Sequence, residues 1–230
     1  MPTQHSSKQY DNDLEEIRSK VLLMAGTVEN QLQEAMNSLK TGNAELALQV
    51  MKGDEGVNGL EVALDDACSH LIVKRQPAAN DLRTVMATIK VITDLERIGD
   101  EAAKIARAVT TANARNVTAI NQYETVRMLA ERAGSLLHGA LDAFARLDIE
   151  QAQKVIVEDD VIDHEFRSVM RSLITFMMED PRTISTALDT MWMAKSIERI
   201  GDHAKNIAEY VVFIVEGKDI RHAGHITSVS

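Results

Sequence analysis

The sequence predicts an all-α protein made of two tandem three-helix bundles related by internal duplication. Hydrophobic residues form 45 % of the 230 residues, aromatic residues only 3 %, and there are 3 prolines, a composition that favours aliphatic helix packing over a β-sandwich. Apolar residues recur at helical spacing along nearly the whole chain, and no segment alternates convincingly with the period of a strand. The third observation is a motif, ERIGD, that occurs at residues 96–100 and again at 198–202.

Five breaks divide the helical pattern into six segments. They lie near residues 41–43, 76–77, 113–117, 147–148 and 180–181. At these points glycine, proline or short polar residues interrupt the pattern, and the polar ones can cap the helix that follows. The long segments between the breaks are typical of bundles, in which each helix packs along its whole length.

The two halves of the chain align with each other. Glu198 follows Glu96 by 102 residues (198 − 96), and the motif matches without a gap. Upstream, residues 53–58 (GDEGVN) align with residues 158–163 (EDDVID) at an offset of 105 (159 − 54), and the loop before the motif absorbs the difference. We therefore predict a first three-helix repeat at residues 1–115, a second at 116–217 and a flexible C-terminal tail at 218–230.

Charge and hydropathy exclude several classes of protein. The formal net charge of −10 argues against broad nucleic-acid binding, which needs clustered lysine and arginine. No apolar run approaches the ~18 residues of a membrane span. The polar N-terminus MPTQHSSKQYDND has no apolar stretch of the kind found in signal peptides, so we expect a cytoplasmic protein.

The ERIGD motif contains two features that weaken an isolated helix. Its acids, Glu96 with Asp100 and Glu198 with Asp202, stand four residues apart, and such like-charge pairs cost roughly 0.2–0.5 kcal/mol. The glycine between them costs about 1 kcal/mol relative to alanine. Both features occur at matching places in both halves, which indicates a purpose beyond helix formation.

An ordinary explanation is a solvated acidic face with ion pairs four residues apart, such as Asp100 with Lys104 and Arg97 with Glu101. Those pairs cannot form in the second half, where the equivalent positions hold Asn206 and His203, although the acids remain. Two carboxylates one helical turn apart suit a cation held between oxygens. The neighbouring helices carry polar pairs at the same spacing, namely Asp54 with Asn58, Asp159 with Asp163, and Glu61 with Asp65.

Helical periodicity also predicts which faces pack. A stripe of Leu95, Ile98, Ala102 and Ile105 is expected to supply the apolar contact at the motif. Farther upstream, a line through Leu82, Met86 and Ile89, with equivalents at Ile184, Leu188 and Met191, is expected to face the core. Trp192 is expected to pack in the core or between helices, and the alternative is an exposed residue that contacts a partner.

At ERIGD, together with KRQPAANDLR (74–83) and LDAFARLDIEQA (141–152), the sequence resembles the PhoU family of phosphate-uptake regulators. The longer matching segments LERIGDEAAKIA and SIERIGDHAKNIAEY contain the two motifs, and the resemblance covers nearly the whole chain. It implies a PhoU-like six-helix architecture and a cytoplasmic accessory protein that is dimeric or a higher oligomer.

The function implied by this resemblance is negative regulation of the phosphate-starvation response. The implied partners are the ATP-binding subunit of the phosphate ABC transporter and a phosphate-sensing histidine kinase, through which alone the protein would meet the membrane. From the residues we expect no dedicated phosphate pocket, because there is no glycine-rich loop before a helix and no dense arginine cluster.

The resemblance also implies metal binding, because the E/DxxxD motifs of some family members hold multinuclear clusters. Iron, zinc, manganese and magnesium are the candidate ions. The matching positions here are Glu96, Asp100, Glu198 and Asp202, with Asp54, Asp159 and Asp163 as partners. Position 58 is Asn where the family pattern prefers Asp, so tight binding is expected less in the first half than in the second.

Two other classes of function compete with this hypothesis. One is a carboxylate-ligated metal store or oxidase in a helical bundle. Ferritin-like sites of that class use Glu-x-x-His, and the residues three before His70, His138, His164 and His203 are not glutamates, so we expect no enzyme activity. The other is a purely structural coiled-coil adaptor, which would not depend on the ERIGD acids.

Overall fold

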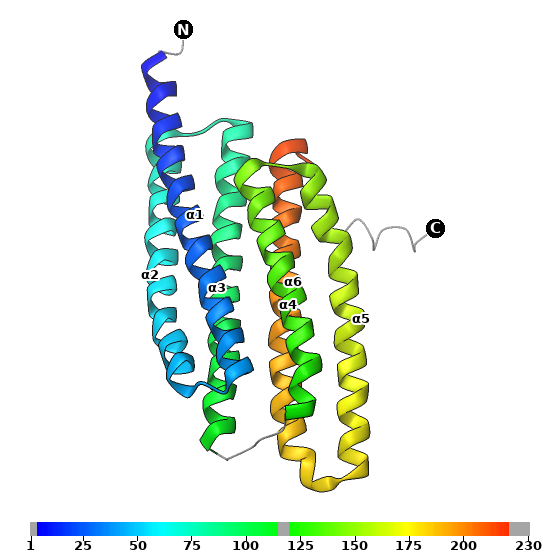
Figure 1. Cartoon of the computed structure of the whole chain (residues 1–230). Helices are drawn as coiled ribbons and strands as arrows, with labels where there is room; N and C mark the ends of the chain where they lie inside the picture. Colours follow the sequence, from blue (N-terminus) through cyan, green and yellow to red (C-terminus); the bar gives the residue numbers. More distant parts are fainter. Residues whose placement is uncertain (1–3, 115–119, 221–230) are drawn as a thin grey trace, which may run out of the picture.

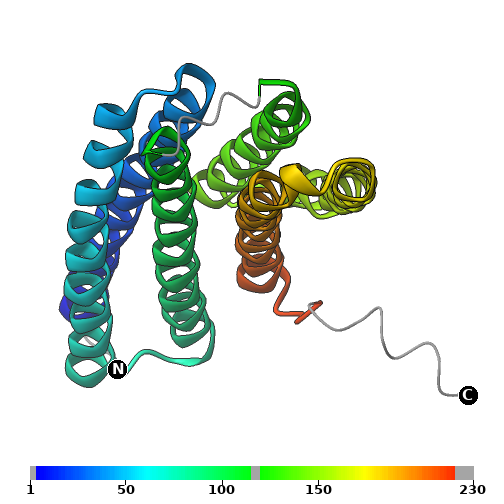
Figure 2. The ribbon, with the colours of Figure 1, turned by 90° about the horizontal axis from the view of Figure 1, so that it is seen from below.

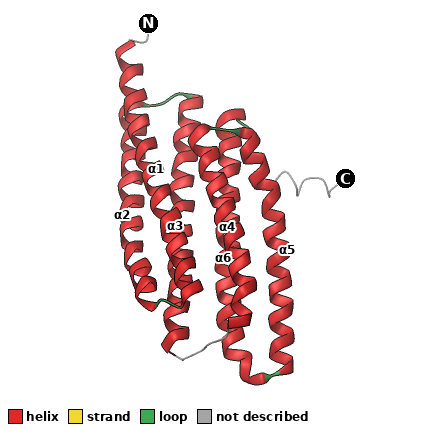
Figure 3. Ribbon diagram, viewed as in Figure 1, coloured by secondary structure: helices red, strands yellow, loops and turns green. Residues whose placement is uncertain are grey.

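The computed structural model describes residues 4–114 and 120–220, and every regular element in these ranges is helical (Figure 3). The elements are α1 (Gln4–Thr41), α2 (Ala44–Arg75), α3 (Ala79–Ala114), α4 (Ile120–Arg146), α5 (Ile149–Glu179), the short 3₁₀ helix η1 (Pro181–Thr183) and α6 (Ile184–Glu216). No helix among the described residues is both long enough and apolar enough to span a membrane.

The helices form two bundles of three. Helices α1, α2 and α3 pack on one another, as do α4, α5 and α6, and the two bundles join where α3 packs on α6 and α1 on α4. Figure 1 shows that α3 and α6 run in opposite directions, and Figure 2 shows the bundles side by side. An antiparallel central pair fits a twofold relation between duplicated halves. The predicted all-α architecture of two three-helix bundles is therefore confirmed.

Local sequence signals end and begin the helices near the predicted breaks. The Asn43 side chain accepts hydrogen bonds from the backbone N–H groups of Glu45 and Leu46 at the start of α2. Asp148 does the same for Gln151 at the start of α5. The break expected at 113–117 lies mostly outside the described residues, as does most of the expected tail, whose residues 221–230 are not described.

The core follows the stripe predicted at the motif. Leu95, Ile98, Ala102 and Ile105 of α3 are fully buried. Their equivalents 102 residues later on α6 are also fully buried, namely Ile197, Ile200, Ala204 and Ile207. Since fully burying a large aliphatic side chain contributes ≈ 1.5–3 kcal/mol, these two stripes fix how α3 and α6 are rotated in the structure.

The apolar line predicted upstream of the motif faces the core only at its C-terminal end, where Ile89 and Met191 are partly buried and pack against it. Leu82 and Met86 are 38 % and 43 % exposed, and their equivalents Ile184 and Leu188 are 41 % and 44 % exposed. The reason is that a helix buries one stripe at a time, and the Leu95 stripe turns this line toward solvent.

The expectation that Trp192 packs between helices is also wrong, because its side chain is 72 % exposed. Its equivalent in the first half is Lys90, whose ammonium group lies over the Tyr210 ring, 5.6 Å from its centroid. Trp192 is therefore a surface residue, whereas its equivalent in the first half is a partly buried lysine that contacts α6.

Gly217 ends α6 in a conformation that other residues adopt at a cost. Its φ is +75°, and a Cβ at this position would collide with Nη1 of Arg83. We expect Gly217→Ala to lower the free energy of unfolding by about 1–3 kcal/mol, measured by urea denaturation. Gly59→Ala is the control, because no atom lies within 4 Å of a Cβ there, and it should raise stability by up to about 1 kcal/mol. Equal effects of the two substitutions would contradict this account.

Candidate functional site

The acids of the first half gather where α2 meets α3. We call Asp54, Glu61, Glu96 and Asp100 the first acidic cluster. Gly99 allows the two helices to come this close, since a Cβ there would lie 3.3 Å from Oδ1 of Asp54 and 3.2 Å from Oε1 of Gln31. The glycine of the motif thus makes room for the carboxylate of the neighbouring helix.

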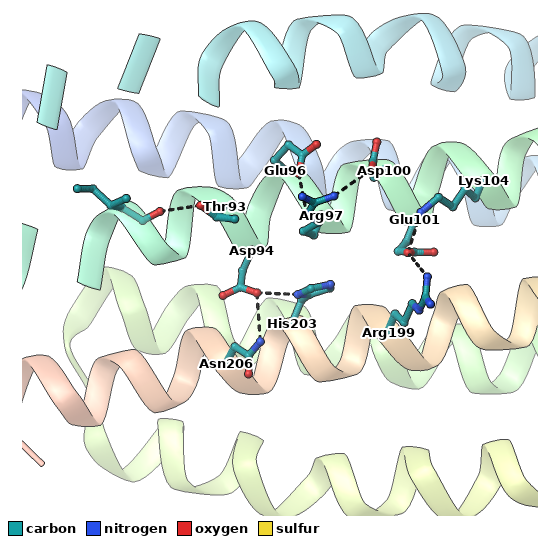
Figure 4. Close-up of polar contacts among 11 residues, drawn as sticks. Thr93, Asp94, Glu96, Arg97, Asp100, Glu101, Lys104, Arg199, His203 and Asn206 are labelled. Atoms are coloured by element: carbon teal, nitrogen blue, oxygen red, sulfur yellow. Dashed lines mark hydrogen bonds and ion pairs between the residues drawn. The ribbon is translucent and has the colours of Figure 1, made fainter. Parts of the chain in front are cut away.

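Gln31 of α1 is a buried residue that is hydrogen-bonded to the first acidic cluster. Its residue is 5 % exposed, and its Nε2 donates to Oδ1 of Asp54 at 3.1 Å. The other amide atom, Oε1, is buried with no hydrogen-bond partner, and so is Oε2 of Glu96. The nearest cation to that Glu96 oxygen is Nε of Arg97, in an ion pair at 3.4 Å (Figure 4).

Burial and mutual repulsion shift the pKa values of these carboxyls. Burial is the largest cause of the raised pKa of Glu96, the charge of Asp100 adds to it, and Arg97 opposes it. Burial also raises the pKa of Asp54, against the hydrogen bond from Gln31, and Asp100 raises it further. The carboxylates of α2 and α3 therefore share one electrostatic environment.

The second half repeats this arrangement between α5 and α6. We call Asp159, Asp163, Glu198 and Asp202 the second acidic cluster. A Cβ at Gly201 would lie 3.2 Å from Oδ1 of Asp159. The two motif glycines therefore serve the same close approach in both repeats.

Lysines neutralise part of the second acidic cluster. Asp159 is 2 % exposed, and Nζ of Lys205 donates to its Oδ2 at 3.0 Å. Nζ of Lys195 donates to Oε1 of Glu198 at 2.6 Å. Asp163, in turn, pairs with Arg167 at 3.3 Å. The second half has Asn206 and His203 at the positions of Lys104 and Glu101, so it cannot form the pairs expected in the first half. Its acids pair with Lys205, Lys195 and Arg167 instead.

Asp202 has the largest shift in this cluster. Although residue 202 is exposed overall, burial of its carboxyl is the largest cause of a pKa raised from 3.8 to about 6. The charges of Glu198 and Asp159 raise it further, whereas Lys195 lowers it. Burial likewise raises the pKa of Asp159, and the hydrogen bond from Lys205 opposes that shift.

The predicted site residues thus form two groups, one in each repeat. Figure 4 shows Glu96 and Asp100 on the α2 side of α3, away from α6, so the four ERIGD acids do not meet at one place. Within residues 4–114 and 120–220, no set of three or more histidine, cysteine, aspartate or glutamate side chains has the arrangement of a metal site as it stands. Asn58 is exposed and Asp54 is half-buried.

The interface between the repeats contains polar pairs that the sequence reasoning missed. Nδ1 of His203 lies 2.6 Å from Oδ1 of Asp94, which is 7 % exposed (Figure 4). The 102-residue offset maps Asp94 onto Ser196 and His203 onto Glu101. Ser196 and Glu101 are also hydrogen-bonded to each other. Equivalent positions of the two repeats therefore form both contacts, Asp94 with His203 and Ser196 with Glu101. The 102-residue offset is the sequence signal that could have predicted these pairs.

Glu101 is the charged centre of this interface. It is 4 % exposed and accepts from Lys104 at 2.9 Å and from Arg199 of α6 at 3.2 Å. Burial would raise its pKa, but the hydrogen bonds from Ser196, Lys104 and Arg199 outweigh burial, so the pKa is lowered. The pairs expected within α3, Asp100 with Lys104 and Arg97 with Glu101, are replaced by Lys104 with Glu101 and Arg97 with Glu96 and Asp100.

Cations from both repeats also meet on the surface along α3 and α6. An open depression of about 740 Å³ is lined by Arg97, Lys104, Arg199 and Lys205, together with Glu101, Asp202 and other polar residues. A second depression of about 390 Å³ shares Glu101, Lys104 and Arg199 and includes Trp192. We call the surface over these two depressions the seam surface. No cluster of this kind is visible in the linear sequence, because its members come from helices about 100 residues apart.

The same duplication appears when the chain is compared with known proteins. The model of the PhoU domain matches it twice, at residues 21–109 and 126–211. The chain belongs to the PhoU family. The two matched PhoU domains hold the first and the second acidic cluster respectively.

Relatives of the PhoU family match the chain over nearly its whole length. The PhoU homolog of Pseudomonas putida, named a phosphate-specific transport system accessory protein, is 44 % identical over 96 % of this chain and 86 % of its own length. The corresponding protein of Escherichia coli K12 is 43 % identical over 96 % of this chain and 90 % of its own. Since PhoU proteins are accessory proteins, this chain is not an enzyme.

Two solved PhoU structures share the fold. The crystal structure of PhoU from Pseudomonas aeruginosa has a TM-score of 0.88 and 42 % identity, covering 91 % of this chain and all of that chain. The regulatory protein PhoU from Streptococcus pneumoniae has a TM-score of 0.83 and 25 % identity, covering 92 % and 99 %. The six-helix PhoU arrangement is thus common to chains with very different sequences.

The raised pKa of Asp202 predicts a pH-dependent stability. The unfolded chain releases this proton near pH 4 and the folded chain only near pH 6, so the group destabilises the fold progressively as the pH rises between these values. We expect the melting temperature of Asp202→Asn to exceed that of wild type above about pH 6, with the difference vanishing near pH 4. Glu158→Gln, an exposed acid on α5, should show no such trend. A difference between Asp202→Asn and wild type that is constant across this pH range would contradict the prediction.

Proposed function

We propose that this protein regulates phosphate uptake as a non-catalytic, cytoplasmic accessory protein and represses the phosphate-starvation response when phosphate is plentiful. Its partners would be the ATP-binding subunit of the phosphate ABC transporter and a phosphate-sensing histidine kinase. The observation that carries this proposal is the match of 43–44 % identity over 96 % of the chain to phosphate-specific transport system accessory proteins. We also propose a homodimer or higher oligomer, with residues 1–115 and 116–217 as the two repeat units.

Regulation without catalysis requires a surface that distinguishes partner states. A protein that binds two states of a partner with equal affinity does not change the equilibrium between them. The binding surface must therefore contact groups of the partner that differ between the two states. The seam surface is a candidate, because exposed charges of both signs there adjoin Trp192. Tryptophan and arginine at the centre of an interface often dominate its binding energy.

The acidic clusters are proposed to hold divalent cations. Two features of the first cluster fit this role: buried oxygens of Gln31 and Glu96 that accept no hydrogen bond, and carboxylates that are crowded and raised in pKa. Hard divalent cations prefer such oxygen donors. A bound cation would link α2 to α3, or α5 to α6, and so stiffen the helices that carry the seam surface.

The alternative of a metal store or oxidase has weaker support. An oxidase would be an enzyme, whereas the relatives of this chain are named accessory proteins, and no ferritin-like Glu-x-x-His pattern precedes His70, His138, His164 or His203. If the protein were a purely structural adaptor, its affinity for its partners would not depend on the ERIGD acids. Partner affinity of the double variant Glu198→Ala with Asp202→Ala, compared with that of wild type, therefore separates the adaptor from the proposed regulator.

Trp192→Ala tests the seam surface. If Trp192 is a contact residue, its loss should weaken binding to the ATP-binding subunit or to the kinase by about 30-fold, corresponding to the ~2 kcal/mol of an interface hot spot. Binding would be measured with purified proteins by biolayer interferometry. Val73→Ala on α2, where the side chain is 77 % exposed, is the matched control and should change nothing. Unchanged binding of both partners by Trp192→Ala would remove the seam surface from the proposal.

Glu96→Gln combined with Asp100→Asn tests the cation site. Binding of Mn²⁺ to the folded state alone raises stability, by about 2.7 kcal/mol at a hundredfold excess over the dissociation constant. We expect the variant to lose most of the Mn²⁺-induced rise in melting temperature. The control with the same charge change is Glu45→Gln with Glu131→Gln, both at exposed positions. Equal Mn²⁺ stabilisation of variant and wild type would exclude the first acidic cluster.

A further inference from the structure

The two acidic clusters share acids at three equivalent positions but not their cations. Lys195 and Lys205 lie against the second cluster, and the residues 102 positions earlier are Thr93 and Ala103. The Thr93 hydroxyl donates to its own helix at the carbonyl of Ile89 (Figure 4). Ala103 is a buried methyl group, 5 % exposed. Neither position can place a charge beside the first cluster.

Lys205 is held firmly against the deepest acid of the second cluster. Its ammonium group donates to Oδ2 of Asp159 at 3.0 Å, and the two side chains are 31 % and 3 % exposed. The ammonium group of Lys205 therefore already neutralises the carboxylate of Asp159.

Lys195 is fixed in a similar way at the other acid of α6. It donates to Oε1 of Glu198 at 2.6 Å, and its Nζ lies 5.4 Å from the centroid of the Phe166 ring on α5. A cation is attracted to the negative face of an aromatic ring, which favours this position of the ammonium group. Two ammonium groups therefore already occupy carboxylate oxygens between α5 and α6.

The first cluster has looser cations and spare acceptors. Arg97, with a side chain 57 % exposed, approaches Glu96 at 3.4 Å and Asp100 only at 3.9 Å. Lys104 is hydrogen-bonded to Glu101 instead. Oε1 of Gln31, a residue 95 % buried beside Asp54, lacks any hydrogen-bond partner. Such an oxygen next to crowded carboxylates is a group that a cation could satisfy.

We propose that Lys195 and Lys205 are built-in counter-ions of the second acidic cluster, so that a divalent cation binds the first cluster more tightly and enters the second only by displacing an ammonium group. This inference rests on the proposed cation binding and deepens it. Asn58 suggested that the second cluster binds a cation more tightly than the first, and this inference reverses that order. An ammonium group within hydrogen-bond distance of a carboxylate weakens binding of a divalent cation more than the absence of one carboxylate at an exposed position does.

The decisive experiment gives the second cluster the residues of the first. Lys195→Thr with Lys205→Ala copies Thr93 and Ala103, and Mn²⁺ binding is followed by the electron paramagnetic resonance signal of the free ion. We expect wild type to bind Mn²⁺ at the first cluster, and the lysine variant to gain a second class of sites about tenfold or more tighter than the second cluster of wild type. The gain should persist when Glu96→Gln and Asp100→Asn are added, because the new sites lie in the other repeat.

A second variant tests whether the result depends on the charges of the two lysines and not on a disturbed fold. Lys195→Met with Lys205→Met keeps long side chains and removes only the charges, so it should show the same gain with an intact helical circular dichroism spectrum. Mn²⁺ should also raise the melting temperature of either lysine variant more than that of wild type.

The outcomes separate the two proposals. Mn²⁺ binding that is lost with Glu96→Gln and Asp100→Asn but unchanged by both lysine variants would overturn the counter-ion role while keeping the cation site. Equal affinity of the two clusters in wild type would overturn it as well. If no protein of the set binds Mn²⁺, the proposed cation binding fails and the counter-ion role fails with it.

Discussion

The close approach of helices at Gly99 and Gly201 is the constraint on which the rest of the structure depends. Each glycine leaves room for a carboxylate of the neighbouring helix, since a Cβ would lie 3.3 Å from Oδ1 of Asp54 or 3.2 Å from Oδ1 of Asp159. A Cβ at either position would force these closely packed side chains to shift. The mid-helix glycine, unfavourable in isolation by about 1 kcal/mol, is therefore compensated by packing that only the tertiary structure provides.

That approach creates an electrostatic problem that each repeat solves differently. Acids drawn between helices lose water, and their pKa values rise, most clearly at Asp202. In the second repeat, lysines of α6 bond directly to Asp159 and Glu198. In the first repeat, Arg97 approaches Glu96 and Asp100 only at 3.4 and 3.9 Å, and Arg107 and Lys104 act on Asp54 through their charges. Buried oxygens of Gln31 and Glu96 lack hydrogen-bond partners there. A duplicated scaffold has thus diverged in its charges while keeping its packing.

Prediction from sequence succeeded where the pattern is local or repeated along the chain. The Leu95 stripe was predicted because helical periodicity is a property of neighbouring residues, and the caps at Asn43 and Asp148 were predicted for the same reason. It failed for Trp192 and for the partners of Glu101, whose surroundings are made by another helix. An ion pair four residues apart can be read from a sequence, but one between α3 and α6 cannot.

The sequence by itself determined that the protein is all-helical, duplicated and related to PhoU, because periodicity, helix breaks and the 102-residue repeat are all written along the chain. The tertiary structure alone decided that the ERIGD acids form two separate clusters, that Asp94 and Glu101 join the repeats, and that lysines occupy one cluster and not the other. These features depend on the rotation and antiparallel packing of α3 and α6, which buried area sets and no single helix encodes.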